Sequence, residues 1–323
     1  MKTRFFQLLI SAIILSFLLT GCGAASLPVS ARPPLKVAWT LWPGWYPILI
    51  AQQQGFFSKH GVNVDPVRYD NYEGVYPDMA SGKLDGALSG LYDLFVPASV
   101  SPMKVVMVTD DSNGAEGLIA VAGINSAADL AHKRIGVSPG SIGEFFTMSL
   151  LLKNGLSGAD VTLLNVDAET VPHQLPSQLD AGYTWQPHLS EAMANNNHIL
   201  SSSADVPGLI PDVVAFQATV VQQRPEDVRA FVAAWFDAVA WWQANPSAGN
   251  DLIAKATAQK SSDISLDGVK IFSQVDNLKA FSQGNDTTSL FFTGKEQLDY
   301  LVSISAFNKT PDLNFMLDPS YLK

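Results

Sequence analysis

The chain has 323 residues, of which 47% are hydrophobic, 15% charged and 10% aromatic, a composition typical of globular proteins and not of disordered, collagenous or disulfide-rich ones. Thirty acidic against 20 basic residues give a net charge of -10, and no basic run exceeds Lys133-Arg134, which excludes a nucleic-acid-binding role. The single cysteine excludes a disulfide framework and multi-cysteine zinc or iron–sulfur sites.

The first 22 residues are typical of an export signal. Two positive charges precede a mostly apolar run over 5–19, which is short for a membrane-spanning helix. The run ends in Leu19-Thr20-Gly21-Cys22, which resembles a bacterial lipobox and implies acylation of the cysteine. We therefore expect a lipoprotein signal over 1–22, a lipid anchor on Cys22 and an Ala/Ser/Pro-rich tether over 23–32. A cleaved secretory signal with an incidental cysteine is the alternative.

Strands and helices alternate along most of the remaining chain. In chain order the patterns predict strand 35–40, helix 46–59, strand 62–69, helix 72–82, strand 84–89, helix 91–100, strands 104–109 and 118–122, helix 126–131, strand 134–138, helix 142–153, and strands 161–165, 181–185 and 213–220. The last 100 residues are mostly helical and include a helix over 224–245. This alternation favours an α/β fold with parallel sheets and helices on both faces.

One glycine-rich turn has to be weighed as a catalytic motif. Gly136-Val-Ser138-Pro-Gly140 matches the G-x-S-x-G elbow of serine hydrolases, but the residue after the serine is Pro139, which has no N–H for an oxyanion hole. A hydrolase is therefore disfavoured. Segment 138–143 is either a plain turn or a loop that presents free N–H groups at a helix N-terminus to a polar ligand atom. Nucleotide and metalloprotease motifs are missing, so we expect no cofactor and no metal.

Tryptophans and acids follow the predicted strands, at the edge where α/β sheets bind ligands. These loops contain no lysine or arginine, although Arg68 lies close by inside its strand. They contain Trp42, Trp45, Asp70, Asp93, Asp110, Asp111, Glu116, Ser141, Glu144, Trp185 and Gln186. Any one of them could be a core residue or a helix cap. Together they favour a cation or a neutral, N–H-rich solute, through cation–π contacts and charge-assisted hydrogen bonds.

Several short motifs follow one another at a recognisable spacing. They are Trp42-Pro-Gly-Trp45, Gly55-Phe-Phe57 with His60-Gly-Val62, Ala80-Ser-Gly82, Lys133-x-x-Gly136-Val137 and Trp185-Gln-Pro187. Over about 35–245 the chain thereby resembles the substrate-binding proteins of bacterial ABC importers for nitrate, sulfonate and taurine, which are related to binders of thiamine pyrimidine precursors. Asp110-x-Ser112-Asn-Gly114 and the segment 204–212 are similar to a branch associated with urea-carboxylase-type nitrogen metabolism. This likeness implies a guanidine- or urea-like solute.

The resemblance implies a two-lobe periplasmic-binding-protein type II fold, with mixed or parallel sheets and the ligand in the cleft between the lobes. Lobe I would comprise 33–115 and 218–323 and lobe II 116–217, with crossovers near Glu116-Gly117 and Phe216-Gln217. The implied ligand-binding residues are Trp42, Trp45, Asp93, Asp110, Glu116, Ser141, Glu144, Trp185, Gln186 and Asp212. Asp93, Asp110 and Glu116 would pair with ligand N–H groups, and Asp212 would do so or order the hinge. Gln186 stands where sulfonate binders tend to have an acid, which argues against an anionic ligand.

The sequence therefore predicts a non-catalytic receptor, lipid-anchored on the outer side of a membrane in the periplasm or at the cell surface. It would be a monomer that captures a small nitrogen-containing solute and delivers it to an ABC permease with its ATPase. The alternatives are a binder of a sulfonate, taurine, nitrate or thiamine pyrimidine precursor, an enzyme like the pyrimidine synthase on the same fold, and a sensor or adhesion lipoprotein. The synthase resembles a cytosolic protein with a cysteine-rich segment, whereas this chain has no cysteine after Cys22.

Overall fold

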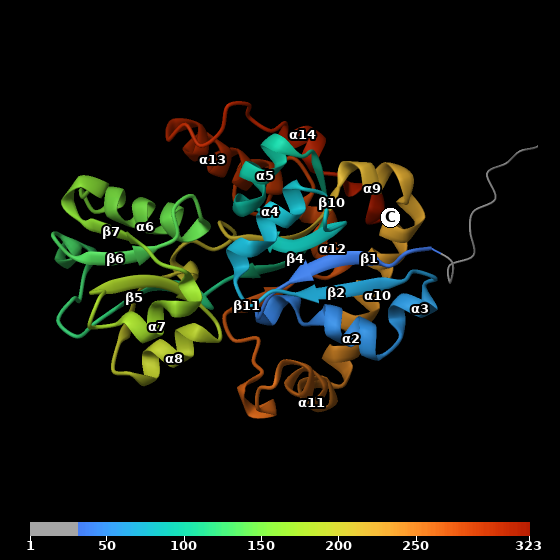
Figure 1. The fold of residues 1–323 in the computed structure, drawn as a ribbon, viewed down its shortest axis with the longest axis horizontal. Coiled ribbons are helices and arrows are strands. Elements are labelled where there is room, and N and C mark those ends of the chain that lie inside the picture. The colour runs from blue at the N-terminus through green and yellow to red at the C-terminus, as the bar shows by residue number, and fades with distance from the viewer. Residues whose placement is uncertain (1–31) are drawn as a thin grey trace, which may run out of the picture. The chain divides into compact units, whose positions relative to one another are not determined.

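The computed structural model of the protein describes residues 32–323, of which Pro34–Lys323 form one compact unit. The expected lipoprotein signal with Cys22, and the expected tether up to residue 31, lie outside the described residues. No helix within 32–323 is long and apolar enough to cross a membrane. Two β-sheets, each flanked by helices, make up the compact unit (Figure 1).

The first sheet has six strands in the order β11-β4-β10-β3-β1-β2. They are β1 (Leu35–Trp39), β2 (Val64–Arg68), β3 (Gly86–Gly90), β4 (Met103–Ser112), β10 (Pro211–Gln217) and β11 (Val269–Ile271). β1 is parallel to β2 and β3, whereas β10 runs antiparallel to both β3 and β4. Because β10 is antiparallel, its first residues lie at the edge where β3 ends, and Asp212 pairs with Gly90.

Short helices connect the strands of this sheet. They are η2 (Pro43–Trp45), α2 (Pro47–Gln53), α3 (Phe56–Lys59), η3 (Tyr72–Gly74), α4 (Val75–Ala80), η4 (Tyr92–Leu94) and α5 (Phe95–Val100). The helix predicted over 46–59 is divided into α2 and α3 at Gly55, whose φ of 74° lies in the left-handed region. Glycine adopts this conformation without steric cost, so the chain turns there and the helix cannot continue.

The second sheet has five strands in the order β7-β6-β8-β5-β9. They are β5 (Glu116–Ala120), β6 (Arg134–Val137), β7 (Thr162–Asn165), β8 (Ala181–Trp185) and β9 (His198–Ser202). β6 is parallel to β7 and β8, and β5 is antiparallel to β8 and β9. The helices around it are η5 (Ala127–Leu130), α6 (Ile142–Lys153), η6 (Gly158–Asp160), η7 (Ala168–Thr170), α7 (Val171–Gln174), α8 (His188–Ala194) and η8 (Ser203–Asp205).

The C-terminal third is mostly helical, as predicted. Its elements besides β11 are α9 (Ala218–Gln223), α10 (Pro225–Ala244), α11 (Pro246–Thr257), η9 (Ser261–Asp263), α12 (Gln274–Ala280), α13 (Leu290–Ser303), α14 (Leu313–Met316) and η10 (Pro319–Tyr321). α10 packs on α3, where the rings of Phe57 and Phe231 stack with centroids 5.3 Å apart. This contact fastens the C-terminal helices to the six-stranded sheet.

The chain passes between the two sheets twice. It leaves the first sheet after Ser112 and enters the second at Glu116, then leaves the second after Ser202 and rejoins the first at Pro211. The return near Phe216-Gln217 expected from the sequence is therefore wrong, because Pro211–Gln217 pairs with β3 and β4 as a fully buried central strand. Below, lobe I means the six-stranded sheet with its helices (34–112 and 211–323), and lobe II the five-stranded sheet with its helices (116–205).

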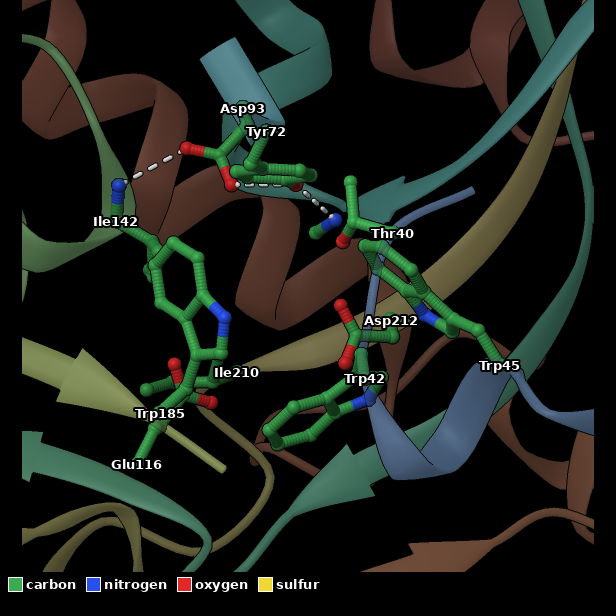
Figure 2. Close-up of a pocket in the computed structure, with 11 residues that line it drawn as sticks. Thr40, Trp42, Trp45, Tyr72, Asp93, Glu116, Ile142, Trp185, Ile210 and Asp212 are labelled. Atoms are coloured by element: carbon green, nitrogen blue, oxygen red, sulfur yellow. Dashed lines mark hydrogen bonds between the residues drawn. The ribbon is translucent and has the colours of Figure 1, made fainter. Parts of the chain in front are cut away.

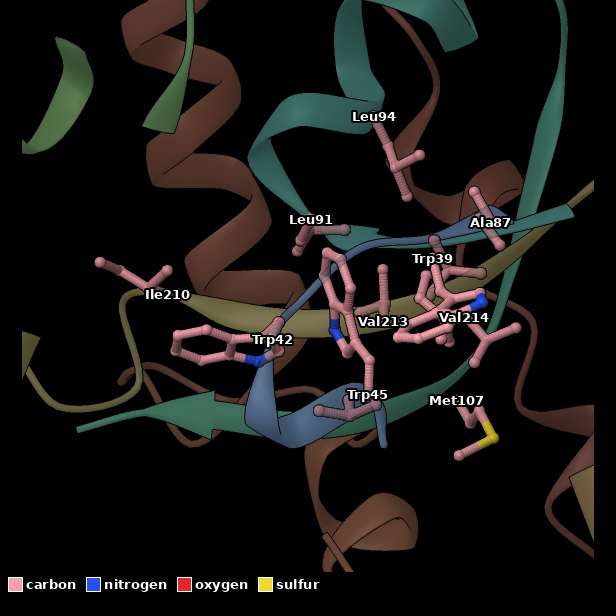
Figure 3. Packing of buried hydrophobic residues seen from close by; sticks show 14 of the residues in the cluster. Trp39, Trp42, Trp45, Ala87, Leu91, Leu94, Met107, Ile210, Val213 and Val214 are labelled. Carbon is pink, nitrogen blue, oxygen red and sulfur yellow. The ribbon is translucent and has the colours of Figure 1, made fainter. Parts of the chain in front are cut away.

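One large apolar core runs through lobe I and into lobe II. Trp42 and Trp45 belong to this core together with Leu91, Val213 and Ile210 (Figure 3). A smaller cluster of buried apolar residues around Ile119 and Leu179 packs on one face of the five-stranded sheet. Burial of the two tryptophans fixes the loop after β1 against the sheet, so their indoles are held in place before any ligand arrives.

Candidate functional site

A cavity of about 30 Å³ lies between the lobes, at the edge where β1, β3 and β8 end. Its walls come from both lobes and from the segment that connects β9 to β10. They consist of Thr40, Trp42, Trp45, Tyr72, Gly90, Asp93, Glu116, Ile142, Trp185, Ile210 and Asp212 (Figure 2). Such a volume corresponds to about two or three water molecules, so the closed cavity suits a very small solute.

Aromatic rings from three segments form the apolar walls. Trp42 and Trp45 are held by the turn after β1, Tyr72 by η3, and Trp185 ends β8. The ring centroids of Trp45 and Tyr72 are 5.7 Å apart, and those of Tyr72 and Trp185 are 5.6 Å apart at an interplanar angle of 77°. Rings arranged at different angles around one small space can present π faces to a cation or to a planar, N–H-rich solute.

Carboxyl groups form the polar walls. Asp93, Glu116 and Asp212 line the cavity and are 7%, 5% and 6% exposed. No lysine, arginine or histidine lines it. Within the described chain, no three His, Cys, Asp or Glu side chains are placed to hold a metal ion. The site is therefore a buried acidic chamber whose own side chains supply no positive charge.

Asp93 connects the two lobes. Its Oδ1 accepts a hydrogen bond of 2.9 Å from the backbone N–H of Ile142, and its Oδ2 accepts one of 3.0 Å from the Tyr72 hydroxyl (Figure 2). Burial raises the pKa of Asp93 to about 8, with a further increase from the Glu73 carboxylate, although both hydrogen bonds favour the charged form. The carboxyl group approaches the backbone closely at Gly90, where a Cβ atom would lie 2.7 Å from Oδ2.

Asp110 lies behind the aromatic wall. Its Oδ1 accepts from the Trp42 indole N–H at 2.9 Å, and its Oδ2 accepts from the Thr109 hydroxyl at 2.7 Å. Burial raises the pKa of Asp110 to about 6. Burial, and then the charge of Asp110, raise the pKa of Asp212 well above its usual range, and Asp212 hydrogen-bonds to Asp110 across β10 and β4. Burial and the neighbouring Asp110 charge therefore favour the protonated form of Asp212.

Glu116, the first residue of β5, closes the cavity from lobe II. Its Oε2 accepts a hydrogen bond from the hydroxyl of Tyr183, which is buried in β8. Burial raises the pKa of Glu116 to about 7, and the Asp110 carboxylate adds to this effect. Three acids from two sheets thus face one cavity with pKa values far above those of exposed carboxyl groups.

Six of the ten predicted ligand-binding residues line the cavity: Trp42, Trp45, Asp93, Glu116, Trp185 and Asp212. Four do not. Asp110 sits behind Trp42, and Gln186 accepts from the N–H and hydroxyl of Ser190 at the start of α8. Ser141 caps α6, donating to the Ser138 carbonyl, and Glu144 accepts from the Gly140 N–H. These four side chains make contacts within the protein and do not line the cavity, so their direct contact with a ligand stays a prediction.

Three N–H groups of segment 138–143, predicted to be a plain turn or a loop that presents free N–H groups, have partners within the protein. The Ile142 N–H donates to Asp93, the Gly140 N–H to Glu144, and the Ser141 N–H to the Ser138 carbonyl. Side chains and carbonyls of the protein satisfy donors that an anionic ligand would otherwise use.

The sequence interpretation missed Thr40, Tyr72, Gly90, Ile142 and Ile210 as walls of the cavity. Tyr72 was the one with a usable signal, because it follows β2 at the same sheet edge as Trp42 follows β1. Asp70, named there instead, is paired with Arg68 at 3.1 Å, and its side chain is 88% exposed.

The lobes are closed on one another beside the cavity. The Tyr72 N–H donates to Glu169 Oε1 at 3.0 Å, and the Asn71 side-chain amide donates to Asp167 Oδ2 at 2.8 Å. With the bond between Asp93 and Ile142, these contacts join the segment after β2 and β3 to lobe II. A solute in the cavity would be enclosed by both lobes.

Part of the chain matches a known protein family. The model of the family described as "NMT1/THI5 like" matches residues 42–249, well over half of the chain. The protein belongs to the NMT1/THI5-like family. The match includes every residue that lines the cavity except Thr40.

Relatives in the NMT1/THI5-like family include proteins provisionally named as binding proteins. One from Brucella abortus (strain 2308) is 30% identical over 212 residues, which are 64% of this chain and 66% of that protein. The alignment thus leaves about a third of this relative uncovered. One from Bacillus subtilis (strain 168), provisionally named an aliphatic sulfonates-binding protein, is 25% identical over 326 residues, covering 98% of this chain and 95% of that one.

Solved structures confirm the predicted two-lobe periplasmic-binding-protein fold. The periplasmic aliphatic sulphonate binding protein SsuA from Escherichia coli superposes with a TM-score of 0.71 at 16% identity, covering 88% of this chain and 97% of that one. The periplasmic nitrate-binding protein NrtA from Synechocystis PCC 6803 gives a TM-score of 0.70 at 13% identity, over 89% and 86%. The desulfurization enzyme DSZB also has this fold, with a TM-score of 0.66 at 17% identity over 90% and 98%. The fold alone therefore decides neither the ligand nor whether the protein is catalytic.

Proposed function

We propose that this NMT1/THI5-like protein is the solute receptor of an ABC importer and that its solute is a small cation of the guanidinium or amidinium class. The observation that carries the proposal is the chemistry of the cavity wall. Four aromatic rings and three buried carboxyl groups surround the space, and no basic side chain lines it. Such a wall offers acceptors and π faces, which match a cation with several N–H donors.

The titration of the acids supports a cationic solute. Burial raises the pKa values of Asp93, Glu116 and Asp212, because the closed cavity holds no positive charge to offset their ionisation. A guanidinium ion would donate N–H groups to these oxygens and make the ionised forms favourable again. An anion would instead meet oxygens that repel it unless they all carry protons.

The size of the cavity supports a very small solute. Room for about two or three water molecules suits a planar, compact ion such as guanidinium or an amidinium. Aliphatic sulfonates and pyrimidine precursors carry chains or rings that would require the lobes to stay further apart. We therefore favour a guanidinium-like ion over the sulfonate, taurine and pyrimidine alternatives.

Two features support a receptor in preference to an enzyme. The hydroxyl groups among the lining residues are those of Thr40 and Tyr72, of which the second already donates to Asp93, and no histidine or lysine lies among them to activate either one. The relative at 30% identity and the one that aligns over nearly the whole chain are also named for binding. We propose that the lobes close around the solute and that the closed form is the one the permease engages.

Urea is a second candidate, favoured by one observation. The indole N–H of Trp45 is buried and has no hydrogen-bond partner in the described part of the chain. Urea, unlike guanidinium, carries a carbonyl oxygen that can accept from such a donor and from a protonated carboxyl group. The two solutes differ in charge, so the pH dependence of binding separates them.

The remaining parts of the proposal concern the cell envelope. The lipobox-like Leu19-Thr20-Gly21-Cys22 supports a lipid anchor on Cys22, with the folded receptor held by a tether on the outer side of the membrane. The partners would be a permease and its ATPase, and the receptor would act as a monomer. Loss of solute uptake on deletion of the gene would separate this role from that of a sensor or adhesion lipoprotein.

A thermal-shift screen of the chain from Ala24 onward, which lacks Cys22 and its proposed lipid anchor, tests the proposal. The solutes are guanidinium, acetamidinium, urea, taurine, methanesulfonate, nitrate and hydroxymethylpyrimidine. A true ligand at about 100 times its Kd stabilises the fold by about 2.7 kcal/mol. We expect a shift with guanidinium or acetamidinium that is reduced in Glu116→Gln and kept in Glu144→Gln, a matched change outside the cavity. A shift confined to sulfonates or nitrate contradicts the cationic solute.

A further inference from the structure

Helix α6 begins beside the cavity, and a carboxyl group from the other lobe occupies its first turn. Ile142, the first residue of this 12-residue helix, belongs to lobe II, and Asp93 belongs to η4 in lobe I. Asp93 Oδ1 accepts the Ile142 N–H at 2.9 Å, and both residues line the cavity. Their separation of 49 positions in sequence makes this a tertiary contact and not a local cap.

A helix N-terminus favours negative charge, because its first N–H groups lack partners within the helix and the helix dipole is positive there. In this chain the negative group is supplied by the protein. A second donor, the Tyr72 hydroxyl, points to the other oxygen of Asp93 at 3.0 Å. The same hydroxyl accepts from the Gly90 N–H at 2.9 Å, so it is held in position to donate to Asp93.

The neighbouring backbone is shaped to admit this carboxyl group. A Cβ atom at Gly90 would lie 2.7 Å from Asp93 Oδ2, which is too close for any other residue without a shift. Gly90 itself lines the cavity at the end of β3. Removing the Asp93 side chain would therefore leave a polar recess, bordered by the Ile142 N–H and the Tyr72 hydroxyl, that opens on the ligand space.

We infer that Asp93 determines the charge specificity of the site, because its carboxyl group occupies the position that an anionic solute would take at the start of α6. This inference rests on the proposed cation-binding function and specifies how that site rejects anions. Asp93 thus acts twice. It blocks the donors that would bind an anion, and it adds an acceptor to the wall that faces a cation.

Nitrate and guanidinium test the inference as a pair, because both are small planar ions and they differ in the sign of their charge. Titration calorimetry would measure both ions on the wild type and on Asp93→Ala, Asp93→Asn and Glu144→Ala. Measurement at about pH 6 lies below the pKa values of about 8 and about 7 of Asp93 and Glu116, so both carboxyl groups are mostly protonated and repel nitrate less.

Asp93→Ala vacates the recess, so we expect nitrate affinity to rise by about tenfold or more and guanidinium affinity to fall by a similar factor. Asp93→Asn keeps an oxygen that can accept from Ile142 and still fills the position, but it cannot ionise when a cation binds. It should lose guanidinium affinity without gaining nitrate. Glu144→Ala, which removes a carboxylate from the Gly140 N–H outside the cavity, should gain no nitrate binding.

Two results would overturn the inference: no gain of nitrate binding in Asp93→Ala, or an equal gain in Asp93→Asn, which would show that nitrate binding does not require the Asp93 position to be vacated. Melting curves establish that each variant is folded, and Asp93→Ser replaces Asp93→Ala if the alanine variant is not. The proposed function fails separately. If the wild type binds neither guanidinium nor acetamidinium at any pH, the cation site itself is wrong, whereas guanidinium binding without a nitrate gain rejects only the role of Asp93.

Discussion

The indole N–H of Trp42 donates to the Oδ1 atom of Asp110 at 2.9 Å, across 68 residues of sequence. Through this hydrogen bond Asp110 positions the aromatic wall, whereas its direct contact with a ligand stays a prediction. The charge of the same carboxyl group helps to raise the pKa of Asp212, which does line the cavity. A substitution of Asp110 should therefore alter ligand affinity indirectly, through Trp42 and Asp212.

The hydrogen bond predicts a difference between two substitutions of Asp110. Asp110→Ala leaves the buried Trp42 N–H and the Thr109 hydroxyl without their acceptor, which costs about 1–3 kcal/mol for each unsatisfied group. Asp110→Asn retains one oxygen for Trp42 and should destabilise less. Urea denaturation of both variants measures the difference. Equal losses of stability would mean that the acceptor for Trp42 is unimportant.

The backbone at Gly44, which lies beside Asp110, predicts that a larger residue there would disturb the site. A Cβ atom at Gly44 would lie 2.1 Å from Asp110 Oδ2, so Gly44→Ala must displace this carboxyl group or the turn that carries Trp42 and Trp45. We expect loss of ligand affinity together with a lower melting temperature. Gly74→Ala is the matched control, because the nearest atom to its Cβ would be 3.5 Å away. Wild-type affinity in Gly44→Ala would show that the turn can shift freely.

The acids predict how stability without ligand depends on pH. The pKa values of Asp93 and Glu116, about 8 and about 7 in the folded protein, stand near 4 in the unfolded chain. Between these values the folded state binds more protons than the unfolded state, so the free energy of unfolding falls as pH rises. We expect the melting temperature of the ligand-free protein to decrease from about pH 5 to about pH 9 through these groups.

The side chain introduced by Glu116→Gln cannot ionise, so the melting temperature of this variant should fall less steeply with pH than that of the wild type. Glu144→Gln, a substitution outside the cavity, serves as the matched control. Scanning calorimetry over the same pH range compares the three proteins. A melting temperature that rises with pH in the wild type, or an identical slope in Glu116→Gln, would contradict the assignment of buried, protonated acids to the cavity.

Trp185 predicts the contribution of the aromatic wall. The centroid of its ring lies 5.6 Å from that of the Tyr72 ring. Because Trp185 belongs to lobe II, it contacts a solute only when the lobes are closed. Loss of a desolvated cation–π contact of about 2 kcal/mol corresponds to about a thirtyfold weaker Kd in Trp185→Ala. Trp185→Phe keeps a π face and should lose less. Calorimetric titration with guanidinium measures both, and an unchanged Kd in Trp185→Ala would remove this ring from the site.

Much of the cavity could be predicted because the ligand edge of an α/β sheet follows from strand order. Trp42 and Asp93 follow predicted strands within a few residues, Trp185 is the last residue of one, and all three line the cavity. The position of Asp212 followed from a likeness of motifs, and its place at this edge depends on the antiparallel direction of β10, which alternation alone did not indicate. The same apolar strand was assigned to the wrong lobe for this reason.

Other residues could not be assigned because their roles depend on distant partners. Ser141, Glu144 and Gln186 follow strands as well, but nearby backbone and side-chain groups take up their hydrogen-bonding atoms. The contact between Asp93 and Ile142 joins two lobes, and no periodicity in sequence encodes it. Whether an acid faces a ligand, caps a helix or supports a tryptophan is decided by tertiary packing.

The central claim is that the cavity takes up a cation in exchange for protons held by its buried acids. Calorimetric titration of guanidinium at about pH 7, repeated in two buffers of different ionisation enthalpy, measures the protons released on binding. We predict saturable binding with net proton release and an affinity that rises with pH. Binding of a sulfonate or nitrate with proton uptake, and no binding of guanidinium, would contradict the claim.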